Sequence, residues 1–294
     1  MKKARSILSL CALSLGLLRC DDTEQFPVTP VPSVSKLTVF DTLLFTKAKD
    51  GVAPGFDLDG KVSTKEDDTS CNIADLKAPD GTPGIDNQLA TLVPLFEAAG
   101  IGAAEGLIQN TIKDGGLLLM LQLDEVESWR NDDSVKVTVR AGKGVPLLGT
   151  NGLLLSGQTF HLHPESPDSV GHGKIERGIL TAGPFEAHLP VVVFGVRYDL
   201  TVHGAVMKCE VDADGELHNG VFGGSVDLAD LRTIGEKAAM DDPSVLPAID
   251  LVFSSAPDMA PDAEGLCQRV SAALSFSAVT AFYYPGEDTG VTTK

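Results

Sequence analysis

Alternation of apolar and polar residues constrains the fold of this chain more than any other feature. Valines alternate with polar side chains over residues 134–140, and four apolar residues alternate with polar ones from Val196 to Val202. A period of two places one face of a β-strand against a core and the other against water. The sequence therefore predicts a chain rich in half-buried strands.

The alternation changes phase at Gly204, because the apolar positions before it are even-numbered and those after it are odd-numbered. One extra residue in a strand reverses its faces, so this change predicts a β-bulge at Gly204. The dipeptide Asp214-Gly215 then predicts a hairpin turn into residues 217–222. Further strands are expected at 36–45, at 117–123 and at 269–283.

Helical spacing of apolar residues appears at 88–113 and at 226–239. Gly100 and Gly102 divide the first stretch into two helices, and Asp86 or Asn87 can cap the first of them. Short turns between most strands favour antiparallel pairing. The expected fold is a β-rich α+β domain, a mainly antiparallel β-sandwich or open barrel with two to three flanking helices.

The first twenty residues read as an export signal. Lys2, Lys3 and Arg5 precede an apolar run of about a dozen residues that ends before Cys20, and this run is too short to cross a bilayer comfortably. The pattern resembles a bacterial lipoprotein signal. That resemblance implies a signal peptide at 1–19, lipid on Cys20 and anchoring in the bacterial cell envelope, at the periplasm or the outer surface. Simple secretion is the alternative.

The residues after Cys20 predict a disordered tether. Residues 21–35 hold three prolines among small and acidic residues, a composition that favours an extended spacer. We expect a disordered tether at 20–35 and a single β-rich domain at 36–294. Residues 46–88 form an acidic subregion of that domain, because they hold too few apolar residues to fold alone.

The charge of the chain excludes one class of partner. The sequence has 41 acidic and 23 basic residues, a net charge of −18. A nucleic-acid binder needs a basic face to neutralise phosphates, so we expect no nucleic-acid partner. A membrane, reached through the anchor at Cys20, is the expected partner. The composition does not identify a protein or glycan partner.

The five cysteines suit an exported protein with one disulfide. Cys71 and Cys267 lie in polar, turn-rich flanks and form the preferred pair, whereas Cys209 lies in a strand-like run and suits a buried thiol. If Cys20 carries no lipid, three two-bridge pairings remain open.

Residues 55–66, GFDLDGKVSTKE, follow the spacing of a calcium loop, although Gly55 stands where that loop begins with Asp. The stretch resembles dockerin and EF-hand loops. A second stretch, PDGTPGIDNQ, partly resembles the thrombospondin type 3 calcium repeat. The two resemblances together imply Ca²⁺ as a cofactor, with ligands drawn from Asp57, Asp59, Lys61, Ser63, Glu66, Asp80, Asp86 and Asn87. A solvated acidic loop whose Asp-Gly pairs make turns is the alternative.

No catalytic motif stands out. His161 and His163 lie two apart on an expected strand, which points both imidazoles to one side, and they are a weak alternative metal site. The acidic segment followed by a β-rich body resembles uncharacterised exported bacterial lipoproteins, a resemblance that implies localisation alone. The leading expectation is a non-enzymatic binding or structural module of the envelope, stabilised by calcium. The alternatives are a secreted hydrolase that uses Asp/Glu or His161/His163, and a carrier of apolar ligands.

Overall fold

A computed structural model of the protein describes residues 33–67, 71–98, 104–193, 196–238, 253–254 and 256–285. The predicted signal peptide, Cys20 and most of the tether lie outside these residues and stay predictions. The described elements, in chain order, are β1 (Val34–Phe45), β2 (Leu76–Lys77), β3 (Pro83–Ile85), α1 (Gln88–Ala98), α2 (Ala104–Lys113), β4 (Leu118–Val126), β5 (Asn131–Lys143), β6 (Gln158–Leu162), β7 (Ser169–Glu176), β8 (Ile179–Val193), β9 (Val196–Val211), β10 (Leu217–Asp227), α3 (Leu228–Ala238), β11 (Met259–Pro261) and β12 (Cys267–Tyr283).

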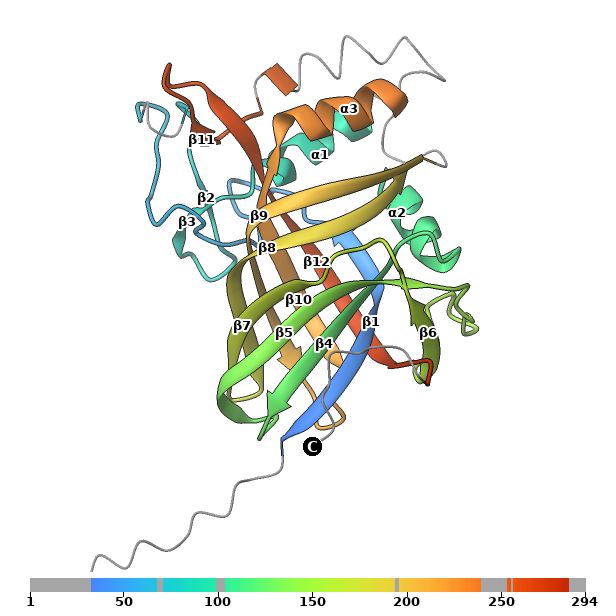
Figure 1. Cartoon of the computed structure of the whole chain (residues 1–294). Coiled ribbons are helices and arrows are strands. Elements are labelled where there is room, and N and C mark those ends of the chain that lie inside the picture. The colour runs from blue at the N-terminus through green and yellow to red at the C-terminus, as the bar shows by residue number, and fades with distance from the viewer. Residues whose placement is uncertain are drawn as a thin grey trace, which may run out of the picture. The chain divides into compact units, whose positions relative to one another are not determined.

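Eight of these strands close into an antiparallel β-barrel (Figure 1). The order around the barrel is β1-β4-β5-β7-β8-β9-β10-β12, and β12 returns to pair with β1 from Leu37↔Ala281 to Phe45↔Leu274. The β-rich, mainly antiparallel fold is confirmed. The sandwich alternative is wrong, because each barrel strand pairs on both sides and the sheet closes on itself.

The interior of the barrel is filled by apolar side chains. Leu121, Leu180 and Met207 have no exposed surface, and they belong to one continuous cluster of buried residues. The Phe40 and Phe276 rings stack inside it with centroids 4.6 Å apart. Gly220 is required beside them, because a Cβ at that position would lie 2.5 Å from the Phe276 ring. Close packing of this kind gives the barrel its main stabilisation.

The predicted bulge at Gly204 is confirmed. On β10 the register moves by two residues, from Gly223 to Ser225, while on β9 it moves by three, from Val206 to His203. Gly204 takes a positive φ of 59°, a conformation that glycine adopts without strain. The hairpin between β9 and β10 is also confirmed, with its turn at Asp212–Gly215.

A buried polar network fastens the outer face of β4 and β5. Arg140 is 8% exposed and donates two hydrogen bonds to Asp168, at 2.9 and 2.6 Å. The same guanidinium donates to Gln122 on β4 and lies within reach of the Tyr283 hydroxyl on β12. Burial works to lower the pKa of Arg140, but these hydrogen bonds outweigh it and the net direction is upward. The network joins three strands and the segment that leads into β7.

The helices follow the predicted spacing. α1 and α2 lie within the predicted 88–113 stretch, and α3 lies within 226–239. α1 packs on β12, and Leu92 of α1 joins a small second core with Val270 and Phe253. Leu228 and Leu231 of α3 pack against the same core, and both helices lie at one end of the barrel (Figure 1). No helix among the described residues has the length and apolar character needed to cross a membrane.

Candidate metal centre and neighbouring pocket

Residues 55–61 form a tight loop held by its own aspartates. The Asp57 carboxylate accepts a hydrogen bond from the Gly60 N–H at 2.7 Å, and Asp59 accepts one from the Lys61 N–H at 2.9 Å. Gly60 has a φ of 78°, as the predicted sharp turn requires. The local sequence therefore folds this stretch into a turn and leaves the outer oxygens of both aspartates available.

Asp86 brings a third carboxylate to this loop from the second acidic stretch. A backbone bridge joins Phe56 to Asp86, and the Leu58 N–H donates to Asp86 Oδ2 at 2.6 Å. Oxygen atoms of Asp57, Asp59 and Asp86 thereby lie within 4.8 Å of one another. Hard oxygens of this kind are the ligands that Ca²⁺ prefers, so the donor set fits a calcium ion.

The environment of Asp86 makes its ionised form costly in the absence of a cation. Burial raises the pKa of Asp86 to about 7, and the hydrogen bond from Leu58 opposes this shift only in part. The neighbouring charges of Asp59 and Asp75 raise it further. Burial also raises the pKa of Asp75, and it raises that of Asp258 to about 6. A divalent cation beside these carboxylates would relieve their mutual repulsion.

The other predicted calcium ligands have different surroundings. Glu66 is exposed, and Asp80 accepts from the Thr82 N–H in a turn of its own. The Ser63 N–H donates to Asp75, so the chain turns away from the cluster after Lys61 instead of continuing into a helix. Asp57, Asp59 and Asp86 are the members of the predicted set that converge.

Asn87 has a structural role that its four hydrogen bonds define. Its Nδ2 donates to Thr46 Oγ1 and to the Pro54 carbonyl, each at 2.7 Å. Its Oδ1 accepts from Ala90 N at 3.2 Å, which caps α1, and from Ala273 N on β12 at 3.0 Å. The side-chain amide therefore ties the acidic region, which we define as residues 46–87, to the barrel.

The disulfide provides a second attachment. Cys71 and Cys267 are bonded, as predicted, with their Cα atoms 6.0 Å apart. The bond joins positions 196 residues apart and fixes the acidic region to the start of β12. Cys209 is a buried free thiol, also as predicted, and burial raises its pKa to about 12.

A pocket of about 320 Å³ lies beside the aspartate cluster, and Asp57 lines it. Its floor is the outer face of the barrel, where β9 contributes His203, β10 contributes Ser225 and β12 contributes Arg269. The register between β9 and β10 brings two of these residues together, because Ser225 pairs directly with His203. The sequence alone does not predict the pocket, since only strand pairing brings these residues together.

Two carboxylates hold His203 at the pocket. Its Nδ1 lies 2.7 Å from Glu186, and its Nε2 lies 3.0 Å from Asp227. Asp227 in turn accepts from Arg269 Nε at 2.9 Å. Burial works to raise the pKa of Asp227, but the bonds from His203 and Arg269 lower it below the ordinary value. Both imidazole nitrogens are occupied, which leaves His203 no free nitrogen to act as a base.

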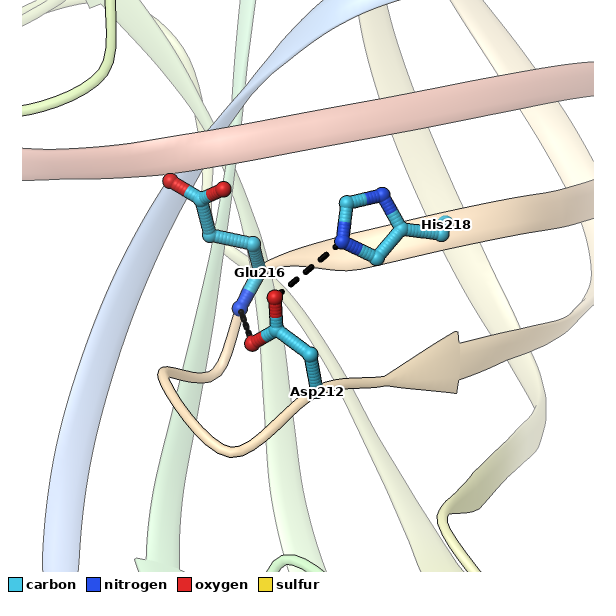
Figure 2. A group of neighbouring side chains, drawn as sticks. All are labelled: Asp212, Glu216 and His218. Carbon is cyan, nitrogen blue, oxygen red and sulfur yellow. Dashed lines mark hydrogen bonds and ion pairs between the residues drawn. The ribbon is translucent and has the colours of Figure 1, made fainter.

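A second group of potential metal ligands lies on the β9–β10 hairpin. Figure 2 shows Asp212, Glu216 and His218, whose ligand atoms lie within 4.8 Å of one another. His218 Nε2 is 3.2 Å from Asp212 Oδ2, and the other Asp212 oxygen accepts from the Glu216 N–H at 2.9 Å. Glu216 also accepts a hydrogen bond from Ser156 Oγ at 2.5 Å. These hydrogen bonds stabilise the turn between β9 and β10.

His161 and His163 have separate partners. The His161 ring stacks on Tyr284 with centroids 3.7 Å apart, and His163 contacts Arg197. Burial and the Arg197 charge lower the pKa of His163. Neither histidine belongs to a group of three potential ligands among the described residues.

Comparisons with known proteins find no match among family models, curated proteins or solved structures. The class that the structure itself defines is an eight-stranded antiparallel barrel, with flanking helices and a disulfide-anchored acidic region.

Proposed function

We propose that this chain is an exported, lipid-anchored, non-enzymatic module of the bacterial cell envelope whose acidic region is stabilised by calcium. The convergence of Asp57, Asp59 and Asp86 carries the calcium part of the proposal. Asp57 and Asp59 belong to a stretch with calcium-loop spacing, and Asp86 belongs to a stretch that partly resembles a calcium repeat. The cluster also occurs where the fold has little apolar core, which is where a structural ion contributes most.

Two features support export. A disulfide persists in oxidising compartments, and Cys71–Cys267 is such a bond. The basic and apolar leader that ends at Cys20 has the pattern of a lipoprotein signal. The acidic, proline-containing stretch after Cys20 would serve as a spacer between the lipid and the domain.

Two further observations favour a module without catalysis or apolar cargo. The carboxylates of Glu186 and Asp227 occupy both nitrogens of His203, so the histidine nearest the pocket offers no free base. Side chains such as Leu180 and Met207 fill the described barrel interior, where a carrier of apolar ligands would need space.

Thermal unfolding of the full chain with Ca²⁺ or with a chelator tests the calcium proposal. A ligand at about a hundred times its Kd stabilises by about 2.7 kcal/mol, so we expect the midpoint to rise by about 5 °C or more. Asp59→Asn should abolish this rise. Asp80→Asn is the matched control, because Asp80 lies in its own turn, and it should keep the rise. Equal midpoints with and without Ca²⁺ would contradict the proposal.

Mass spectrometry of the N-terminus tests the anchor. Protein taken from bacterial membranes should begin at Cys20 with a diacylglyceryl mass, and Cys20→Ser should move the protein to the soluble fraction. An unmodified terminus at another residue would contradict the anchor and leave the calcium proposal standing.

A further inference from the structure

The pocket beside the aspartate cluster has the features of a built ligand site. Its residues come from distant parts of the chain: Leu58 from the acidic region, Glu186 from β8, Ser225 from β10, Met259 from β11 and Arg269 from β12. Its volume of about 320 Å³ lies at the lower end of the range for small-molecule sites. The pocket therefore suits a small ligand.

Ser225 gives the first sign of what that ligand carries. The residue is 5% exposed and lines the pocket, yet its hydroxyl makes no hydrogen bond with any other described residue. Its oxygen keeps some accessible surface, so the hydroxyl is a donor that is open to the pocket. A ligand oxygen in the pocket would accept this hydrogen bond.

Arg269 supplies a second set of open donors. Its Nε donates to Asp227, and this bond fixes the plane of the guanidinium. Within the described chain no hydrogen bond reaches Nη1 or Nη2, although Arg269 lines the pocket. A guanidinium fork of this kind matches the two oxygens of a carboxylate.

Apart from His203, the remaining polar side chains of the pocket are acidic. Asp57 uses one carboxylate oxygen to accept from Gly60, and Glu186 is half-exposed beside His203. These carboxylates would repel a simple anion but would attract a positive charge. Pro184 and Val206 add apolar surface to the same lining.

We propose that this pocket binds a small zwitterion of the amino-acid type. Arg269 and Ser225 donate hydrogen bonds to its carboxylate, and its ammonium lies beside the carboxylate of Glu186. Pro184, Val206 and Met259 contact its side chain. His203 acts as a positioning residue, since it holds Glu186 and Asp227 in place. The inference goes beyond the proposed function, because this binding requires neither calcium nor the lipid anchor.

Calorimetric titration of the full chain with each of the twenty L-amino acids at millimolar concentration tests the proposal. At least one should bind with a stoichiometry of one. Its N-acetylated form and its amide should each bind at least tenfold more weakly, because each lacks one of the two charges. If every amino acid fails to bind, or if the blocked forms bind equally well, the proposal is overturned.

Variants locate the binding. Ser225→Ala removes a hydroxyl that has no partner in the protein, so it should fold normally and weaken binding about tenfold. Arg269→Gln should weaken binding at least a hundredfold, with circular dichroism confirming the fold. Arg130→Gln, at an exposed arginine outside the pocket, is the control and should bind as the parent does. Unchanged affinity in both pocket variants would overturn the assignment. Asp59→Asn should retain binding, which separates this result from the calcium test.

Discussion

The barrel and the acidic region of this protein are stabilised in different ways. The barrel buries side chains such as Leu121 and Met207 completely and pairs every strand on both sides. The described part of the acidic region has only the short strands β2 and β3, and side chains such as Asp57, Asp75 and Asn87 bond its backbone. The first region depends on apolar burial, whereas the second depends on polar contacts and one disulfide.

This difference predicts which changes should destabilise each region. Stability that comes from apolar burial responds weakly to pH and to divalent cations, but it falls when buried side-chain atoms are removed. A region built on buried carboxylates should respond to protons, to calcium and to the loss of single hydrogen bonds. The following substitutions act on one region at a time.

The largest effect is expected in the barrel. Leu121→Ala leaves a cavity in a closely packed interior and should lower the free energy of unfolding by about 3–5 kcal/mol. Chemical denaturation with a fluorescence readout measures this loss. Val170→Ala is the control, because Val170 is 47% exposed on β7, and its effect should stay within about 0.5 kcal/mol. Similar losses in both variants would argue against a packed interior.

Removal of the disulfide should come next. The double variant Cys71→Ser/Cys267→Ser opens a link between positions 196 residues apart and should destabilise by about 2–4 kcal/mol. Proteolysis should then begin between residues 46 and 87 while the barrel stays intact. First cleavage within barrel strands would contradict the separation of the two regions.

Asn87→Ala should destabilise by about 2–3 kcal/mol, because three backbone groups and the Thr46 hydroxyl each lose a hydrogen bond at a buried site. Asn110→Ala is the matched control, at an exposed position on α2, and should leave the unfolding midpoint nearly unchanged. Denaturation of the two variants side by side gives the comparison. A loss below about 0.5 kcal/mol in Asn87→Ala would show that this amide does not hold the region.

The pH dependence gives the smallest expected effect. The pKa of Asp86 is raised to about 7 in the folded state, so the native protein binds more protons than the unfolded chain between about pH 4 and pH 7. In chelator, stability should therefore fall as the pH rises through this window, on the order of 2 kcal/mol, and then level off.

Asp86→Asn should remove most of this slope, while Asp258, whose pKa is raised to about 6, leaves a smaller slope of the same sign. Saturating Ca²⁺ should also flatten the slope in the parent, because the ion favours the ionised carboxylate. Urea denaturation at several pH values measures each slope. A parent whose stability rises with pH through this window would contradict the assigned direction.

The sequence predicted much of the barrel but not its closure. Alternation around Val137 and Tyr198 identifies strands and their faces, yet it does not say which strands are neighbours, so sandwich and barrel both fitted. The strands β7 and β8, at 169–193, were not predicted. Glycines such as Gly171 and Gly173 interrupt the apolar alternation there, because Phe185 and Ala182 lie too close for a side chain.

Only part of the candidate site could be predicted from the sequence, because the rest depends on which strands are neighbours. Asp57 and Asp59 follow from local spacing, and Asp86 follows from the second acidic stretch. The spacing also included Glu66, but no helix follows Gly60 to carry that side chain back to the cluster. Ser225 and Arg269 belong to no motif, because the register between strands brings them to the pocket.

Hydrogen exchange of the full chain with and without Ca²⁺ tests the central claim most directly, because it reports on both regions in one experiment. Ion binding by Asp57, Asp59 and Asp86 predicts that Ca²⁺ slows exchange at residues 55–61 and 85–87. The amides of β4, β5 and β9 should exchange at the same rate in both conditions. Equal exchange throughout, or a slowing spread evenly over the barrel, would contradict the account.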